Sequence, residues 1–157
     1  MKLLGIAIGT LAMIVTVVFG PRPALAAGSD QPTAALTQAI RAFNHGDLKV
    51  WAAMCDSPAV AIDDFPPHLW QGTTACADWA RAFTAMTKQQ GITPGVVTLG
   101  APWHSAVTGN RAYLVYPVTF RYRLKGKPMI DAGVFTFVMN KTASGWRIAA
   151  WSWADRH

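Results

Sequence analysis

Apolar residues change their spacing near residue 93 and divide the chain into a helical half and a strand half. Before that point, intervals of three and four residues predict three helices, over 33–44, about 48–55 and about 73–90. A short apolar run between the second and third helix predicts one strand, over 59–63. Beyond residue 93, alternation of period two predicts four more strands, over about 95–107, 111–124, 128–140 and 145–154.

The four later strands are joined by short turns, so they are expected to run antiparallel in sequence order. They are apolar on both faces, which indicates that helices cover one face and that curvature, a pocket or a partner covers the other. Pro117 cannot donate a ladder hydrogen bond and is expected at a bulge or an edge. Because bulges bend sheets, the pattern predicts a curved sheet around helices, with a cavity inside.

The first 26 residues have the features of a secretory signal peptide: a basic start, an apolar stretch over 3–20 and the cleavage signal Ala24-Leu25-Ala26. An uncleaved membrane anchor is the alternative, since the apolar stretch is just long enough to span a bilayer. Either way, the domain is expected to be periplasmic or secreted, and not membrane-bound once the signal is cleaved. We expect a flexible leader over 27–33 and a single domain over 34–157.

Charged residues are scarce, every acidic residue is Asp, and the formal net charge is +6. The basic residues are scattered, and their one cluster, RYRLKGK over 121–127, is explained by a solvated hairpin end. A nucleic-acid-binding surface needs a denser basic stripe, so nucleic acid is not expected as a partner. The sequence contains no Gly-rich phosphate loop and no Ser-His-Asp arrangement, and no cofactor is expected.

Two cysteines, Cys55 and Cys76, leave two possibilities open. In an oxidising compartment they can form a disulfide worth about 3 kcal/mol. They can instead be two small buried thiols. Their spacing matches no metal motif, and no metal is expected.

Three stretches carry a family resemblance: AFNHGDLKVWAAM over 42–54, AVAIDDFPPHLWQG over 59–72 and GWRIAAWSWAD over 145–155. With the order of helices and strands, they resemble the nuclear transport factor 2-like superfamily, as an exported SnoaL-like or ketosteroid isomerase-like member. The resemblance implies an α+β, cystatin-like fold, in which a cone-shaped curved antiparallel sheet wraps around three N-terminal helices and an apolar pocket. Members include isomerases, polyketide cyclases, dehydratases, epoxide hydrolases and proteins that only bind or assemble, so fold alone leaves function open.

Comparison with the ketosteroid isomerases implies a partial active site. Their general base, an Asp on the first strand, aligns with Asp63 or Asp64. Their catalytic Tyr aligns with Ala39, and their protonated Asp aligns near 133–135, where no acid occurs and Asp131 is a few residues away. A base is therefore implied without that family's oxyanion-binding pair, and steroid isomerisation is not expected.

The stretch IDDFPPHLW over 62–70 carries the candidate chemistry. If the strand continues, Asp63 and Asp64 point to opposite faces, and the inward one is a candidate general base because burial raises the pKa of a carboxyl group. A solvated strand end is the alternative. His68, and His104 on the first long strand, are candidate catalytic helpers. An exposed loop histidine and a structural strand histidine are the alternatives for these two.

Asp131 lies among apolar residues and needs a partner if it is buried. An ion pair with Arg121 or Arg123 across the hairpin is one possibility, and a pocket acid is the other. Large aromatic rings suit flat apolar ligands, and the ligand-binding candidates beside Asp131 are Trp70, Trp103, Tyr116, Trp151 and Trp153. The alternative for these rings is a core and a dimer interface.

Three functions fit these features. The chain binds a small hydrophobic ligand and performs cofactor-free isomerase or cyclase chemistry on it, or it binds such a ligand without catalysis. Alternatively it is a dimerisation or protein-interaction module with a filled cavity and an exposed apolar patch. A homodimer is expected, because sheets of this kind often pair through their exposed face.

Overall fold

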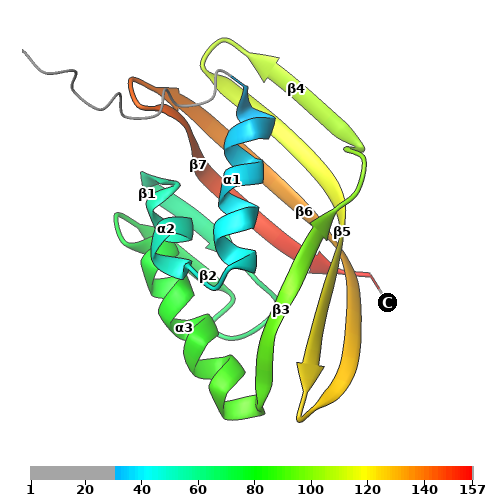
Figure 1. The fold of residues 1–157 in the computed structure, drawn as a ribbon. Helices are drawn as coiled ribbons and strands as arrows, with labels where there is room; N and C mark the ends of the chain where they lie inside the picture. Colours follow the sequence, from blue (N-terminus) through cyan, green and yellow to red (C-terminus); the bar gives the residue numbers. More distant parts are fainter. Residues whose placement is uncertain (1–30, 157) are drawn as a thin grey trace, which may run out of the picture.

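Three helices and seven strands make up the part of the chain that the computed structural model describes, residues 31–156 (Figure 1). The helices are α1 (Pro32–Asn44), α2 (Leu48–Ala53) and α3 (Ala75–Gln90). The strands are β1 (Cys55–Ile62), β2 (Leu69–Gly72), β3 (Ile92–Leu99), β4 (His104–Thr108), β5 (Arg111–Leu124), β6 (Lys127–Thr142) and β7 (Gly145–Asp155). The predicted α+β class is confirmed: the helices cover one side of a curved, unclosed sheet.

Local signals explain where each helix begins and ends. Pro32 opens α1, where its missing N–H removes no helical hydrogen bond. Asp47 caps α2, because its carboxylate accepts a hydrogen bond from the Val50 N–H at 3.0 Å. α3 ends at Gly91, which adopts the left-handed conformation with φ of 73°. Since these signals are local, the helix ends were predicted to within about two residues.

The sheet has the strand order β2-β1-β7-β6-β5-β3, and β4 pairs with β5 as well. Neighbouring strands run antiparallel except β1 and β7, which run parallel. The two longest strands, β5 and β6, pair continuously from Arg111 opposite Asn140 to Leu124 opposite Lys127. The largest fully buried side chains of the core are Trp51, Phe137, Leu36, Leu114, Met139 and Ile148.

The strand predicted over 95–107 is interrupted and forms β3 and β4 instead. Pro117 of β5 explains the interruption, because its missing N–H faces this edge of the sheet. The N–H groups of Gly100 and Trp103 donate to the carbonyls of Pro117 and Val115, at 2.9 Å each. An added Cβ at Gly100 would lie 3.0 Å from the proline ring. The irregularity expected at Pro117 therefore lies in the neighbouring strand. β5 itself pairs with β6 without interruption at Pro117.

β1 begins at Cys55, earlier than the expected residue 59, and α2 is correspondingly shorter. Met54, the residue just before β1, is held by a distant strand: the Ile148 N–H of β7 donates to the Met54 carbonyl at 3.1 Å. Cys55 also forms a disulfide with Cys76, which decides between the two possibilities for the cysteines. The bond joins the start of β1 to the first turn of α3.

β2 was not among the predicted strands, and Pro66 and Pro67 lie just before it in the chain. Both prolines are confined to the loop after β1, and the chain then returns beside β1 with Leu69 opposite Ile62. The first strand is therefore one arm of a hairpin whose loop carries the candidate residues.

At the N-terminal end, α1 begins at Pro32, so the last two residues of the predicted leader over 27–33 are helical. The predicted signal peptide over 1–26 lies outside the described residues. Between residues 31 and 156, no helix is long and apolar enough to cross a membrane.

Candidate functional site

A cavity of about 390 Å³ lies between the helices and the sheet. Its wall is contributed by all three helices, by β3, β5, β6 and β7, and by the loop between β1 and β2. On α3 the lining residues recur at helical spacing from Trp79 to Gln90, so one face of that helix forms a continuous side. The lining residues are Ile40, Phe43, Trp51, Asp63, Asp64, Phe65, Pro66, Trp79, Phe83, Met86, Thr87, Gln90, Ile92, Val97, Phe120, Tyr122, Asp131, Phe135, Trp151 and Trp153.

Asp63 is the most strongly perturbed polar group of this wall. Its Oδ2 accepts a hydrogen bond from Trp79 Nε1 at 2.7 Å, and its Oδ1 accepts one from the Asp64 backbone N–H at 2.8 Å. Burial raises the pKa of Asp63 from 3.8 to about 7; the Trp79 hydrogen bond opposes this rise, and the Asp64 carboxyl adds to it. A carboxyl group with such a pKa exchanges its proton readily at neutral pH, as a general base or acid must.

The loop after β1 brings Asp63 and Asp64 to the same cavity. The Asp63 N–H donates to the His68 carbonyl at 3.1 Å, and the His68 N–H donates to the Phe65 carbonyl at 3.0 Å, so the loop is closed by its own backbone. Because β1 ends at Ile62, strand alternation does not extend to the two aspartates, and both line the cavity. Opposite faces were expected only if the strand continued through the two aspartates, and this condition is not met. Asp64 is exposed, so it lies where the cavity meets solvent.

A second polar pair, Tyr122 of β5 and Asp131 of β6, lines the cavity on the sheet side. The two side chains are hydrogen-bonded. The pKa of Tyr122 is raised above its ordinary value of 10.0, mainly because the hydroxyl group is buried and secondarily because the Asp131 carboxylate is near. Arg121 and Arg123 project from the opposite face of β5, because side chains alternate along a strand. The expected ion pair of Asp131 is therefore absent, and its carboxylate belongs to the cavity wall.

Three tryptophans pack against one another in the wall. Trp79 and Trp151 meet edge to face with ring centroids 4.9 Å apart, and Trp51 lies 5.9 Å from each. The Trp79 N–H is used on Asp63, whereas the N–H groups of Trp51 and Trp151 are buried and find no hydrogen-bond partner among the described residues. Each of these two groups therefore carries the free-energy cost of an unpaired buried donor.

Trp151 and Trp153 share the inward face of β7, and both line the cavity. The Trp153 ring lies over Gly133 of β6, where an added Cβ would be 2.8 Å from a ring carbon. Gly133 lies in the region 133–135, which aligns with the protonated Asp of the ketosteroid isomerases. An indole ring occupies that part of the wall instead.

Both histidines of the predicted site lie outside the cavity. His68 is exposed, and its Nδ1 is 3.2 Å from the Asp63 carbonyl oxygen, so it contacts the loop backbone rather than the carboxyl group. His104 is exposed on β4 and packs against the Tyr113 ring at 5.6 Å. Across residues 31–156, no three His, Cys, Asp or Glu side chains gather as in a metal site.

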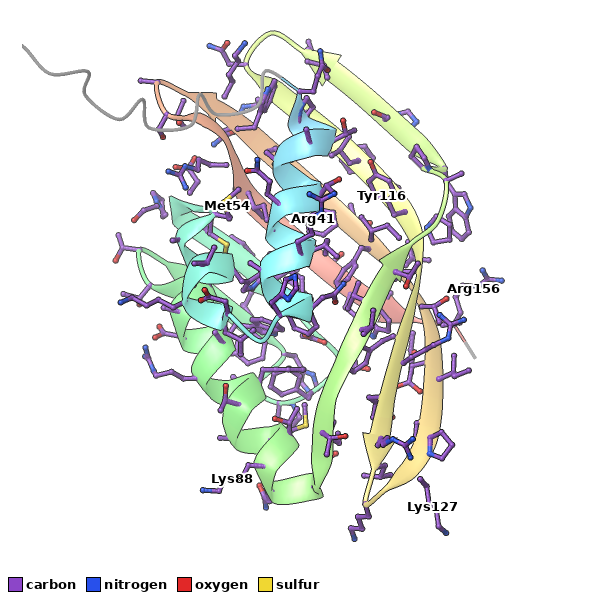
Figure 2. The ribbon with its side chains drawn as sticks, viewed as in Figure 1. Arg41, Met54, Lys88, Tyr116, Lys127 and Arg156 are labelled. Carbon is purple, nitrogen blue, oxygen red and sulfur yellow. A yellow bond between two sulfur atoms is a disulfide. The ribbon has the colours of Figure 1, made fainter. Side chains whose placement is uncertain are left out.

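Three of the predicted aromatic residues also lie outside the cavity wall. Trp103 is 57% exposed, and the Arg156 guanidinium lies over its ring at 5.6 Å. Trp70 and Tyr116 are buried in the core: Trp70 packs behind Phe65 at 5.1 Å, and Tyr116 lies between β5 and α1 (Figure 2). These two rings support the wall from behind, because other residues separate them from the cavity.

Much of the aromatic wall was missing from the predicted site. On α3 the sequence did indicate these wall residues, because the helical spacing of Trp79, Phe83 and Met86 places them on one face of the helix. On β5, Phe120 and Tyr122 alternate together, but alternation does not tell which face of a strand is concave. That choice depends on where the helices pack.

This arrangement of three helices and a curved sheet has counterparts among known proteins. The family model described as the SnoaL-like domain matches residues 33–153. The chain belongs to the SnoaL-like family. The resemblance inferred from the sequence is thereby confirmed, and the match covers nearly all of the described part of this SnoaL-like protein.

Solved structures share the fold at low identity. A nuclear transport factor 2-like superfamily protein from Salmonella enterica is 20% identical, with a TM-score of 0.65 over 80% of this chain and 88% of its own. A ketosteroid isomerase-like protein from Erwinia carotovora is 16% identical, with a TM-score of 0.63 over 80% and 93%. A protein from Streptomyces avermitilis, described as a candidate dehydratase of the same superfamily, is 16% identical, with a TM-score of 0.64 over 80% and 94%. Comparison with curated proteins finds no match.

Proposed function

We propose that this SnoaL-like protein binds a small, largely apolar ligand in its cavity and that Asp63 transfers a proton on that ligand. The observation that carries the proposal is the Asp63 carboxyl group, which is held by the Trp79 N–H in a mostly apolar wall and has a pKa of about 7. Burying such a group costs stability, and strongly perturbed carboxyl groups cluster at functional sites. The cavity volume, about 390 Å³, falls within the rough range of 300–1,000 Å³ for small-molecule sites.

The reaction class supported best is proton transfer without a cofactor, as in an isomerase, a cyclase or a dehydratase. Ionised Asp63 would accept a proton from a carbon or hydroxyl group of the ligand, and the protonated form would return it elsewhere on the same molecule. The isomerase-like and dehydratase-like relatives support this class at the level of fold.

Native mass spectrometry of the protein purified from the periplasm tests ligand binding. We expect a discrete extra mass of a few hundred daltons that is lost on denaturation. An apo mass, together with failure to bind any small apolar compound, would contradict the proposal.

Hydrogen exchange into the bound compound tests the role of Asp63. In D₂O the wild type should introduce deuterium at the position from which Asp63 removes a proton, and Asp63→Asn should slow this by about 10²–10⁴-fold. Asp78→Asn is the charge-matched control, because Asp78 bonds to Thr74 and Arg81 on the outer side of α3. Equal exchange by Asp63→Asn and the wild type would reduce the proposal to binding without catalysis.

Export and dimerisation form a second part of the proposal. The Cys55–Cys76 disulfide is consistent with an oxidising compartment. At the β4–β5 edge, Tyr113 is 45% exposed and Trp103 57%, and a second copy of the chain would cover such rings. Cell fractionation followed by light scattering tests both points: cytoplasmic location would contradict export, and a monomer at micromolar concentration would contradict the dimer.

A further inference from the structure

Charges are sorted between the outer surface of the protein and its cavity. The chain contains 14 Lys and Arg residues and has a net charge of +6. None of the described residues that line the cavity is Lys, Arg or His, whereas three are carboxylic acids, Asp63, Asp64 and Asp131. A basic protein therefore encloses an acidic cavity.

Strand β5 illustrates how this separation arises. Tyr122 lines the cavity, and the residues on either side of it, Arg121 and Arg123, project from the outer face of the strand. At the same end of the molecule, Lys88 and Lys127 are exposed and point away from the fold (Figure 2). The cavity carboxyl groups therefore have no basic side chain beside them in the wall to balance their charge.

The remainder of the wall also favours positive charge. Ten of the lining side chains are aromatic. Phe120 and Tyr122 stack at 4.9 Å, and Trp79 and Phe83 stack at 5.1 Å, so extended ring surfaces are available. The face of an aromatic ring carries partial negative charge and attracts cations, and tryptophan does so most strongly.

Two tryptophans of the wall contribute ring surface rather than hydrogen-bond donors. Trp51 and Trp151 are each 2% exposed and line the cavity, and their N–H groups find no acceptor among the residues described. Because both nitrogens are enclosed by the protein itself, these two residues offer a ligand their aromatic rings, which attract cations.

We propose that the ligand of this cavity is a small apolar organic cation, an amine or a quaternary ammonium compound, whose charge Asp64 and Asp131 balance while its apolar part lies among the rings. The inference rests on the proposed function, because it names the class of molecule for the same site. A neutral ligand would leave the carboxylates uncompensated, and an anion would be repelled by them. Balancing by Asp64 and Asp131 leaves Asp63 available to move a proton.

Binding of a cation should also depend on pH in one direction. The titratable groups that face Asp63 are Asp64 from its own loop, Tyr122 from β5 and Asp131 from β6, while the lining residues of the helices, β3 and β7 do not titrate. A nearby positive charge favours the ionised form of Asp63, so binding should release a proton near pH 7. The affinity for a cation should therefore rise between pH 6 and pH 8, and the affinity for a neutral compound should not.

Three compounds of similar shape test the inference on the wild-type protein: benzyltrimethylammonium, its uncharged carbon isostere neopentylbenzene, and phenylacetate. Binding is measured through the fluorescence of the cavity tryptophans at pH 7.5. We expect the cation to bind at least about tenfold more tightly than the isostere, and phenylacetate to bind most weakly. Equal or tighter binding of the isostere or of phenylacetate would overturn the inference and leave the proposed function intact. Failure of all three to bind would overturn both.

Two variants locate the effect. Asp131→Asn should weaken benzyltrimethylammonium about tenfold and leave neopentylbenzene unchanged, which would also show that the variant is folded. Asp78→Asn removes a carboxylate outside the cavity and should change neither affinity. An equal loss for the cation in both variants would mean that net charge, not the cavity, attracts it, and would overturn the inference.

Discussion

Two stretches of this chain resemble each other in composition and lie in opposite environments. IDDFPPHLW over 62–70 and GAPWHSAV over 100–107 both combine proline, histidine and tryptophan with apolar neighbours. The first contributes both of its aspartates to the cavity wall. The second lies at the edge of the sheet, where Trp103 and His104 are exposed.

The difference between the two stretches is the element that covers them. α3 packs over the first, and its Trp79 donates to Asp63 at 2.7 Å. The second leads into β4, whose one strand neighbour is β5. Residue types therefore indicate candidate sites. A carboxyl group acquires a perturbed pKa, however, only where an element distant in the sequence buries it.

The largest effect is expected from the bond that ties the first stretch to α3. Replacing both cysteines, Cys55→Ser and Cys76→Ser, should lower the free energy of unfolding by about 3 kcal/mol, because the unfolded chain gains freedom. Urea unfolding followed by tryptophan fluorescence measures it. His104→Ala at the opposite edge is the control and should stay within about 0.5 kcal/mol of the wild type. Undiminished stability of the double variant would show that packing alone holds α3 against β1.

Asp63→Asn should abolish the pH dependence of stability that burial of this carboxyl group creates. The unfolded chain releases the Asp63 proton near pH 3.8 and the folded protein releases it near pH 7, so the stability from this group is complete below 3.8 and is lost as pH rises towards 7. The side chain of asparagine does not titrate, so the variant does not lose this stability as pH rises. Relative to the wild type, the variant should gain about 2 kcal/mol between pH 4 and pH 8. Thermal unfolding across this range measures the gain, and parallel curves for the two proteins would contradict the raised pKa.

Trp79→Phe sharpens the comparison by removing the hydrogen bond while keeping a ring over Asp63. That bond favours the ionised carboxylate, so its loss should raise the pKa of Asp63 further. Carbon-13 NMR of the aspartate carboxyl groups follows the titration. Trp51→Phe is matched to it, because the Trp51 N–H has no partner among the described residues and its removal should leave the pKa in place. The same shift in both variants would assign the effect to packing.

The smallest effect is expected at the exposed edge. Trp103→Ala removes the contact with the Arg156 guanidinium and should cost about 0.5 kcal/mol. Ligand binding in the cavity should be unchanged, since Trp103 does not line it. Calorimetry with a compound that binds the wild type measures this, and a clear loss of affinity would show that the second stretch reaches the cavity after all.

Sequence reasoning succeeded where the signals were local. Helix periodicity, the Asp47 cap and the Gly91 stop defined the helices, and period-two alternation defined the long strands. It failed where one segment acts on another from a distance. Pro117 interrupts a neighbouring strand rather than its own, and Ile148 holds the chain just before β1.

The candidate site was predicted in part for the same reason. Alternation correctly grouped Trp151 with Trp153, because both lie on one strand and one face. It could not tell that both aspartates of the first loop line the cavity, since the loop is closed by backbone hydrogen bonds of His68 and not by a ladder. Nor could alternation tell that the side chain of Asp131 interacts with Tyr122 rather than with a neighbouring arginine. That depends on which face of β5 is concave.

The sequence by itself determined the elements, their order, the family and the residues available for chemistry, because periodicity, caps and turn residues act over a few positions. Only the tertiary structure decided which of two similar stretches lines the cavity and why its carboxyl group holds a proton near pH 7. It also decided that Asp63, Asp64 and Asp131 line the cavity and that none of the described basic residues does. Burial and electrostatic neighbours are properties of segments far apart in the chain, and they exist only once α3 has packed against the sheet.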